Sequence, residues 1–186
     1  TNGTIEYSTC DDYQTADYYQ IPKKSGNETI IEPYEEEETG TDLMTTLCVP
    51  IKEKGRVIGV VGVDIFLKTI DAMVSRIKVY ETGYLSIFSN NGKVVSHPKK
   101  EAIGSSIFTL AKWTVPFKQA ISSGAGFSTE NFSKRAGEYM DRICVPLHVG
   151  ETETPWAVLI NIPQSKVKEK ARSVVYTTIF IGVLSL

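Results

Sequence analysis

Four residues have side chains suited to binding a cationic ligand: Tyr18, Tyr19, Tyr34 and Asp64. A tyrosine ring attracts a cation to its π face, and a carboxylate among apolar residues gains from a positively charged partner. If the fold brings these side chains together, they would form an aromatic cage around a ligand ammonium. Two other interpretations stay open. A single tyrosine is more often a core residue than a binding residue, and Asp64 could instead cap a helix that begins near Leu67.

Signatures of catalysis and of metal binding are missing from the sequence. The histidines are His97 and His148, and Cys10, Cys48 and Cys144 form neither a CxxC motif nor a zinc spacing. No HxxxH, GxSxG or Gly-Lys-Ser/Thr motif occurs. We therefore expect no enzyme activity, no metal site and no cofactor. A net charge of -2 also gives no electrostatic footprint for nucleic acid. Buried free thiols are expected for Cys48 and Cys144, and a Cys10–Cys48 bridge stays open.

A repeated hairpin organises the segments that would hold the candidate residues. Residues 48–65 (CVPIKEKGRVIGVVGVDI) align without a gap with residues 144–161 (CVPLHVGETETPWAVLIN). Each copy has the pattern of an apolar strand, a polar turn and a second apolar strand. In this alignment Asp64 stands opposite Ile160, so the two copies differ most sharply in chemistry at this position.

Side chains alternate between the two faces of a strand. One face of the first copy therefore carries Val60, Gly62 and Asp64. The alignment assigns the same face of the second copy to Trp156, Val158 and Ile160. We expect the second copy to fill this face with bulk, and the first to leave a gap at Gly62 with a carboxylate at its rim.

The hydrophobic pattern of the whole chain is that of an α+β protein. Helices are expected at residues 12–20, 67–79 and 107–121, the last one interrupted near Pro116. Residues 21–27 are expected to form a loop. Strands are expected at residues 29–35, 43–51, 57–65, 84–89, 93–96, 127–132, 138–147 and 156–162. Because short turns join neighbouring strands, we expect antiparallel meanders.

The two ends of the chain predict a fragment of a membrane protein. Residues 174–186 (VVYTTIFIGVLSL) carry no charge. A membrane span needs about 20 apolar residues, so we interpret this segment as the start of one; a C-terminal core helix is the alternative. The second repeat unit opens with a hairpin that the first lacks, which predicts that the opening strands of the first unit lie upstream of Thr1.

Several short runs occur in an order that resembles a known family. They are DYY at residues 17–19, IEPY at 31–34, VPI at 49–51, GVVGVDI at 59–65, GY at 83–84, NG at 91–92, SHP at 96–98 and TPW at 154–156. Together with the apolar tail they resemble the double Cache (dCache) ligand-sensing domain over nearly the whole chain.

The resemblance implies an α+β fold of two PAS-like (Cache) modules with antiparallel sheets, the first truncated at its N-terminus. Residues 1–66 would form the membrane-distal module and residues 67–82 a connecting helix. Residues 83–163 would form the membrane-proximal module, and residues 164–186 an exit helix with the start of the second transmembrane span. In this family the distal module binds the ligand.

The function implied by the resemblance is small-molecule sensing on the periplasmic or extracellular side of the cell membrane. The chain would belong to a homodimeric transmembrane chemoreceptor, a methyl-accepting chemotaxis protein. The sensor domain of a histidine kinase or of a nucleotide (di-guanylate) cyclase is the alternative, and a secreted binding protein is a more distant one.

The resemblance also assigns the candidate residues. Amino-acid-binding members carry an Arg-x-Trp-Tyr run, a tyrosine on the next strand and the aspartate of a Gly-x-Asp-Ile run. Tyr18, Tyr19, Tyr34 and Asp64 stand at the last four of these positions, whereas Ala16 stands at the arginine. A ligand carboxylate favours a guanidinium partner. We therefore expect an amine or an amino acid as the ligand, without the usual carboxylate clamp.

Overall fold

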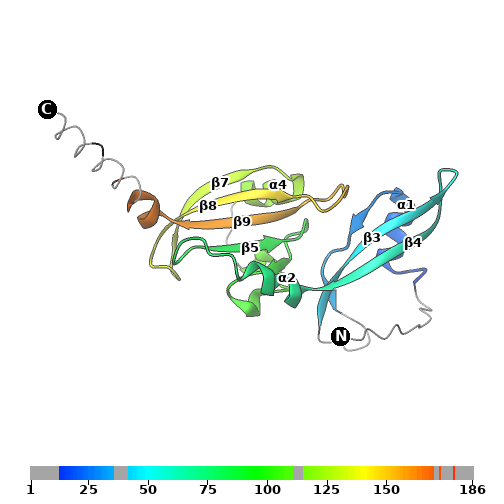
Figure 1. Ribbon diagram of the computed structural model, residues 1–186, viewed down its shortest axis with the longest axis horizontal. Helices are drawn as coiled ribbons and strands as arrows, with labels where there is room; N and C mark the ends of the chain where they lie inside the picture. Colours follow the sequence, from blue (N-terminus) through cyan, green and yellow to red (C-terminus); the bar gives the residue numbers. More distant parts are fainter. Residues whose placement is uncertain (1–12, 36–41, 111–114, 170–171, 173–177, 179–186) are drawn as a thin grey trace.

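The computed structural model describes residues 13–35, 42–110, 115–169, 172 and 178. These residues form two antiparallel sheets that lie end to end in an elongated molecule (Figure 1). The first sheet contains β1 to β4 and the second contains β5 to β9. The expected α+β class is therefore confirmed, and Cys10 lies outside the described residues.

The long hairpin of β3 (Leu43–Glu53) and β4 (Arg56–Phe66) is the centre of the first sheet. The single strand expected at residues 29–35 is wrong, because the structure divides it into β1 (Thr29–Ile30) and β2 (Tyr34–Glu35). Both short strands pair with β3. The break falls at Pro33, which has no N–H to donate to a neighbouring strand.

Helix α1 (Asp17–Ser25) packs against β3 and β4. The loop expected at residues 21–27 is wrong, since the helix continues through Pro22. It ends at Gly26, which has φ 70° and whose N–H donates to the Pro22 carbonyl at 2.8 Å. A glycine with left-handed backbone angles commonly ends a helix. In this chain Gly26 ends α1, four residues after Pro22.

Helix α2 (Leu67–Val74) connects the two sheets and is five residues shorter than the expected helix at 67–79. The hairpin of β5 (Tyr84–Phe88) and β6 (Val94–Ser96) follows, as expected. The remaining elements are η1 (Lys100–Ala102), α3 (Ile107–Leu110), α4 (Val115–Ser123), β7 (Phe127–Ser133), β8 (Glu138–Leu147) and β9 (Trp156–Pro163). The strand order of the second sheet is β6-β5-β9-β8-β7.

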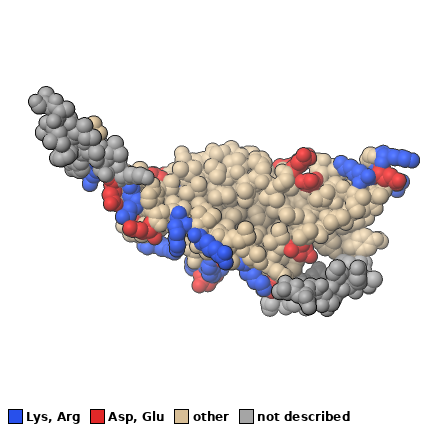
Figure 2. Space-filling model, in the orientation of Figure 1, with Lys and Arg blue, Asp and Glu red and all other residues tan. Residues whose placement is uncertain are grey.

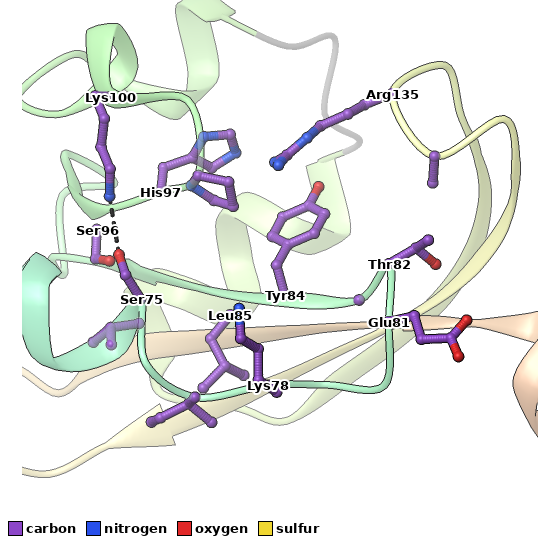
Figure 3. A pocket seen from close by; sticks show the side chains of 15 residues that line it. Ser75, Lys78, Glu81, Thr82, Tyr84, Leu85, Ser96, His97, Lys100 and Arg135 are labelled. Atoms are coloured by element: carbon purple, nitrogen blue, oxygen red, sulfur yellow. Dashed lines mark hydrogen bonds between the residues drawn. The ribbon is translucent and has the colours of Figure 1, made fainter.

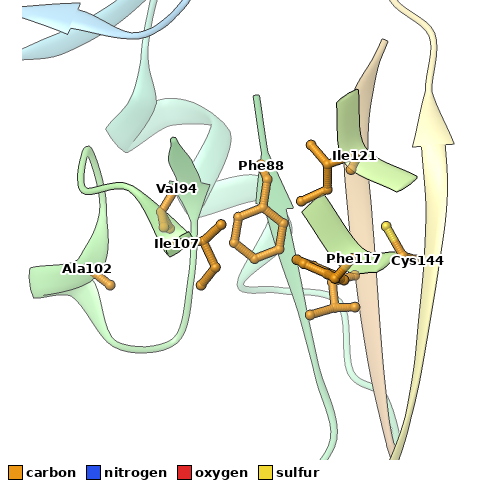
Figure 4. Packing of buried hydrophobic residues seen from close by; sticks show 9 residues of the cluster. Phe88, Val94, Ala102, Ile107, Phe117, Ile121 and Cys144 are labelled. Atoms are coloured by element: carbon orange, nitrogen blue, oxygen red, sulfur yellow. The ribbon is translucent and has the colours of Figure 1, made fainter. Parts of the chain in front are cut away.

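The second sheet has a closed core on its helix side. Phe88, Phe117 and Ile121 are each at most 1% exposed and pack with Leu159 and Cys144 in one cluster (Figure 4). Close packing of this kind leaves little room for a ligand between the sheet and its helices.

A second cluster joins the two sheets. Ile30 and Leu67 come from the first half of the chain and pack against Ile87, Val95 and Trp156 of the second sheet. Because this cluster is apolar and buried, we expect the two sheets to move as coupled units.

Hydrogen bonds reinforce the same contact. The Glu32 carboxylate accepts from the Ser89 hydroxyl at 2.5 Å and from the Asn91 N–H at 3.0 Å. Lys93 Nζ donates to the Pro33 carbonyl at 2.6 Å. The segment between β1 and β2 is therefore tied to the β5–β6 turn.

Residues 164–169 are helical and follow β9 directly. Within the described residues, no helix combines the length and apolar character that a membrane crossing requires. The apolar segment at 174–186 lies outside the described residues, apart from Thr178.

Candidate functional site

A cavity of about 830 Å³ opens on the helix side of the first sheet, between α1 and the β3–β4 hairpin. Its described lining residues are Tyr13, Tyr18, Tyr19, Tyr34, Thr46, Ile58, Gly59, Val60, Gly62 and Asp64. We call it the tyrosine pocket. The structure therefore brings together all four residues that the sequence singled out.

A chain of hydroxyl groups holds the Asp64 carboxylate in the tyrosine pocket. Thr46 Oγ1 donates to Asp64 Oδ1 at 2.7 Å, and the Tyr34 hydroxyl lies 2.7 Å from Thr46 Oγ1. A threonine hydroxyl has one proton, so Tyr34 is the donor in the second bond. The Tyr34 hydroxyl also lies 3.4 Å from Asp64 Oδ1. Among the described residues, Asp64 Oδ2 has no hydrogen-bond partner, so this oxygen is available to a ligand.

The helix-capping alternative for Asp64 is wrong. The residue at the N-cap of α2 is Phe66, and no side chain caps this helix end. Asp64 is exposed and pairs across the hairpin with Thr46. Its carboxylate is therefore oriented toward the tyrosine pocket by the sheet register.

The electrostatics of the tyrosine pocket follow from burial and from this carboxylate. Burial, followed by the nearby Asp64 charge, raises the pKa of Tyr34. Burial and then Asp64 raise the pKa of the Cys48 thiol to about 11. Both groups therefore stay neutral at pH 7, and Asp64 supplies the negative charge of the described lining.

The aromatic part of the tyrosine pocket is partly engaged within the protein. The rings of Tyr13 and Tyr19 meet edge to face with centroids 4.9 Å apart. Lys23 Nζ lies 4.8 Å from the centre of the Tyr19 ring. The Tyr19 ring thus already contacts one ammonium group within the protein.

No lysine or arginine belongs to the described lining of the tyrosine pocket. Ala16 is the N-cap residue of α1 and does not line the pocket. Of the described residues, no group of three or more His, Cys, Asp or Glu could hold a metal ion. The described lining therefore carries the Asp64 carboxylate and no basic side chain.

The strand registers correct the comparison between the two hairpins. Cys48 pairs with Gly62 in the first sheet, whereas Cys144 pairs with Leu159 in the second. The gapless alignment had placed Gly62 opposite Val158, so it is wrong by one residue. A shift of one residue moves every side chain to the other face.

The counterparts of Val60, Gly62 and Asp64 are accordingly Ala157, Leu159 and Asn161. Trp156 belongs to the cluster that joins the two sheets. The second sheet fills its helix side with Leu159, while a Cβ at Gly62 would lie 3.0 Å from Thr46 Cγ2. Because Gly62 has no side chain, the tyrosine pocket stays open at this position.

Sequence reasoning missed Tyr13, Thr46, Ile58 and Gly59, which also line the tyrosine pocket. Tyr13 falls just before α1, and no periodic signal places it. Thr46 lies two residues before Cys48 on β3 and therefore faces the same side. Its position opposite Asp64 becomes apparent only from the pairing of β3 with β4.

Comparison with known proteins agrees with this architecture. The dCache_1 family, described as a Cache domain, matches residues 1–171. The chain belongs to this family. The two antiparallel sheets and their helices are consistent with the α+β fold of this family.

The similar proteins include methyl-accepting chemotaxis proteins and a histidine kinase. The methyl-accepting chemotaxis protein PctB of Pseudomonas aeruginosa is 29% identical over 111 residues, which cover 60% of this chain and 17% of PctB. A solved structure named methyl-accepting chemotaxis protein X is 30% identical with a TM-score of 0.68, covering 87% of this chain and 60% of that one.

The extracellular domain of the putative histidine kinase mmHK1S-Z3 is 27% identical with a TM-score of 0.76. That comparison covers 92% of this chain and 62% of that extracellular domain. The chain thus spans less than a fifth of PctB and about three fifths of the two solved chains.

Proposed function

We propose that this chain is the ligand-sensing part of a transmembrane chemoreceptor of the methyl-accepting type, located on the outer side of the cell membrane. The Cache family match and the similarity to PctB support this proposal. The protein would act as a homodimer anchored through the segment that follows β9. It would transmit a binding event and would carry no catalytic residues in this region.

In this proposal residues 1–66 form the distal module that binds ligand, and residues 67–82 connect it to the proximal module at residues 83–163. Residues 164–186 lead to the membrane. Tyr34 in the tyrosine pocket follows directly on the Glu32–Pro33 segment, which is bonded to the β5–β6 turn. A ligand that prefers one arrangement of Tyr34 would therefore shift the balance between two arrangements of the modules.

The ligand would be an organic amine, bound through its ammonium group by Asp64, Tyr18, Tyr19 and Tyr34. The observation that carries this proposal is the Asp64 carboxylate, which has one oxygen held by Thr46 and the other open to the tyrosine pocket. An α-amino acid fits less well, because no cation in the described lining would pair with its carboxylate.

A thermal-shift screen with amines, amino acids and dicarboxylates tests this assignment. We expect amines to raise the melting temperature of the wild-type protein, and Asp64→Asn to abolish that shift while the protein stays folded. Glu53→Gln is the matched control, since Glu53 is an exposed acid at the far end of β3. Stabilisation by dicarboxylates alone, unchanged in Asp64→Asn, would contradict the amine assignment.

A histidine kinase output is the second candidate. The similarity to the extracellular domain of mmHK1S-Z3 supports it. The two candidates share the sensor function and differ in the cytoplasmic domain of the full-length protein. The coding sequence beyond Leu186 decides between them: a methyl-accepting signalling domain supports the first and a kinase domain the second.

A further inference from the structure

A second cavity, of about 540 Å³, lies beside the second sheet, away from the tyrosine pocket. One wall is the segment of residues 74–83 that links α2 to β5. The other wall consists of residues 96–98, Lys100 and the β7–β8 turn with Arg135. We call this cavity the link cleft. Figure 2 shows Lys and Arg side chains gathered along the side of the molecule that carries α2 and β5.

Three hydrogen-bond donors converge in the link cleft. The Arg135 guanidinium lies 5.2 Å from the centre of the Tyr84 ring, and the Tyr84 and His97 rings meet edge to face at 5.8 Å. His97 Nδ1 accepts from the Lys99 N–H at 2.9 Å. A neutral imidazole with an accepting Nδ1 carries its proton on Nε2. Figure 3 shows Tyr84, His97 and Arg135 pointing toward one another.

These donors lack an acceptor within the described residues. No hydrogen bond engages His97 Nε2 or the Tyr84 hydroxyl there, and Arg135 has no carboxylate partner. Lys78, which also lines the cleft, has none either. A guanidinium, an imidazole N–H and a phenol that face one another without an acceptor form a site for an anion.

The acidic groups near the link cleft are already paired. Asp71 Oδ2 accepts from Lys100 Nζ at 2.5 Å and Asp71 Oδ1 from the Ser96 hydroxyl at 2.9 Å. The Glu81 carboxylate lies 3.0 Å from Lys166 Nζ and points away from His97 (Figure 3). The positive charge of Arg135 and Lys78 therefore remains uncompensated.

The direction of the pKa shift of His97 agrees with this charge distribution. Burial lowers the pKa of His97, and the charges of Arg135, Lys100 and Lys99 lower it further. An anion bound in the cleft would stabilise the protonated imidazole and raise this pKa.

The other lining residues limit the class of anion. Val74, Ile77, Leu85 and Pro98 give the cleft an apolar wall beside its cationic centre. A cavity of this size is typical of small-molecule sites. A short aliphatic carboxylate would place its charge at Arg135 and its carbon chain on the apolar wall, which inorganic phosphate cannot use.

We propose that the link cleft is a second ligand site, which binds a short aliphatic carboxylate through Arg135, His97 and Tyr84. The segment of residues 74–83 is also connected by hydrogen bonds to the start of the C-terminal helix. Thr82 Oγ1 donates to Glu138 Oε1 at 3.2 Å, and Glu138 Oε2 accepts from the Ser165 N–H at 3.1 Å. An occupied cleft would therefore act on the segment that leaves the second sheet.

Isothermal titration of the 186-residue protein with propionate at constant ionic strength tests the proposal. We expect saturable binding to the wild type, at least tenfold weaker binding to Arg135→Gln, and unchanged binding to Arg56→Gln. Arg56 is the matched control because it is an exposed arginine at the start of β4. Unchanged binding in Asp64→Asn separates this site from the proposed amine site, so either assignment can fail alone.

An NMR titration of His97 gives a readout that a structural role of Arg135 would not produce. We expect propionate to raise the pKa of His97 in the wild type and not in Arg135→Gln. Absence of saturable propionate binding, or equal affinity in Arg135→Gln, would overturn the proposal. Equal affinity for phosphate and propionate would overturn the carboxylate assignment.

Discussion

Replacing Thr46 by valine removes the hydroxyl that links Tyr34 to Asp64 and keeps the shape of the side chain. Thr46 is 3% exposed, and both of its hydrogen bonds measure 2.7 Å. A hydrogen bond contributes about 1 kcal/mol, and somewhat more when one partner is charged. Asp64 is exposed, and Tyr34 lies near enough to Asp64 Oδ1 to replace part of the loss. We expect Thr46→Val to lower the free energy of unfolding by about 1–2 kcal/mol.

Thr46→Val should also lower the affinity for the ligand, in addition to its effect on stability. Without the Thr46 donor, the Asp64 carboxylate is free to rotate, and a bound ammonium must order it. Losing about 1 kcal/mol of preorganisation corresponds to an amine affinity about five- to tenfold lower. Isothermal titration with the amine identified by thermal shift measures this change, and urea unfolding measures the stability.

The neighbouring threonine provides the control for this experiment. Thr45 is fully buried on the opposite face of β3 and donates to the Ile31 carbonyl at 2.5 Å. Thr45→Val should therefore cost about 1–2 kcal/mol of stability as well, and change amine affinity by less than about twofold. Equal affinity losses in the two variants, or no loss in Thr46→Val, would refute the role of the hydroxyl chain.

Two further predictions concern the pocket floor and the buried thiols. Gly62→Leu should lower amine affinity more than tenfold and change stability by less than about 2 kcal/mol. The reason is that a Cβ at this position already meets Thr46 Cγ2 at 3.0 Å. Val61→Leu on the exposed face is the control, and retained affinity in Gly62→Leu would contradict the prediction. Burial raises the pKa of Cys144 from 9.0 to about 11, so the folded state keeps this proton to a higher pH than the unfolded chain. Its contribution to stability is intact below pH 9 and is lost as pH rises toward about 11, by on the order of 2 kcal/mol. Urea unfolding across this range should show a shallower pH dependence in Cys144→Ala; identical slopes would refute the assignment.

Local patterns predicted most of the strands. Residues 138–147 coincide with β8, and the expected strands at 43–51 and 57–65 lie within β3 and β4. Turn signals bound these segments, and the segments at 43–51 and 57–65 are predominantly apolar. Predictions failed at Pro22 and Pro33, because a proline removes one donor and its surroundings decide whether the helix or strand continues.

The candidate site was predictable as a set of residues and not as an arrangement. Tyr18, Tyr19, Tyr34 and Asp64 were recognised from their types and from the family resemblance, and all four line the tyrosine pocket. The donor that holds Asp64 and the free oxygen that faces a ligand depend on which residue of β3 lies opposite. That pairing is a contact between residues 18 positions apart, Thr46 and Asp64.

The link cleft could not be inferred from the sequence. The cleft unites the segment after α2, the end of β6 and the β7–β8 turn. These parts are separated in the chain and meet only when the second sheet forms.

The amino-acid sequence alone determined the α+β class, the repeated hairpin and the four candidate side chains, because these follow from side-chain type and local periodicity. Tertiary structure decided which face each residue occupies. The two hairpins differ by one residue in register, so the counterpart of Asp64 is the buried Asn161 instead of Ile160. The physical reason is that side chains alternate with a period of two, and the register is set by pairing and packing across the whole sheet, which a local alignment cannot detect.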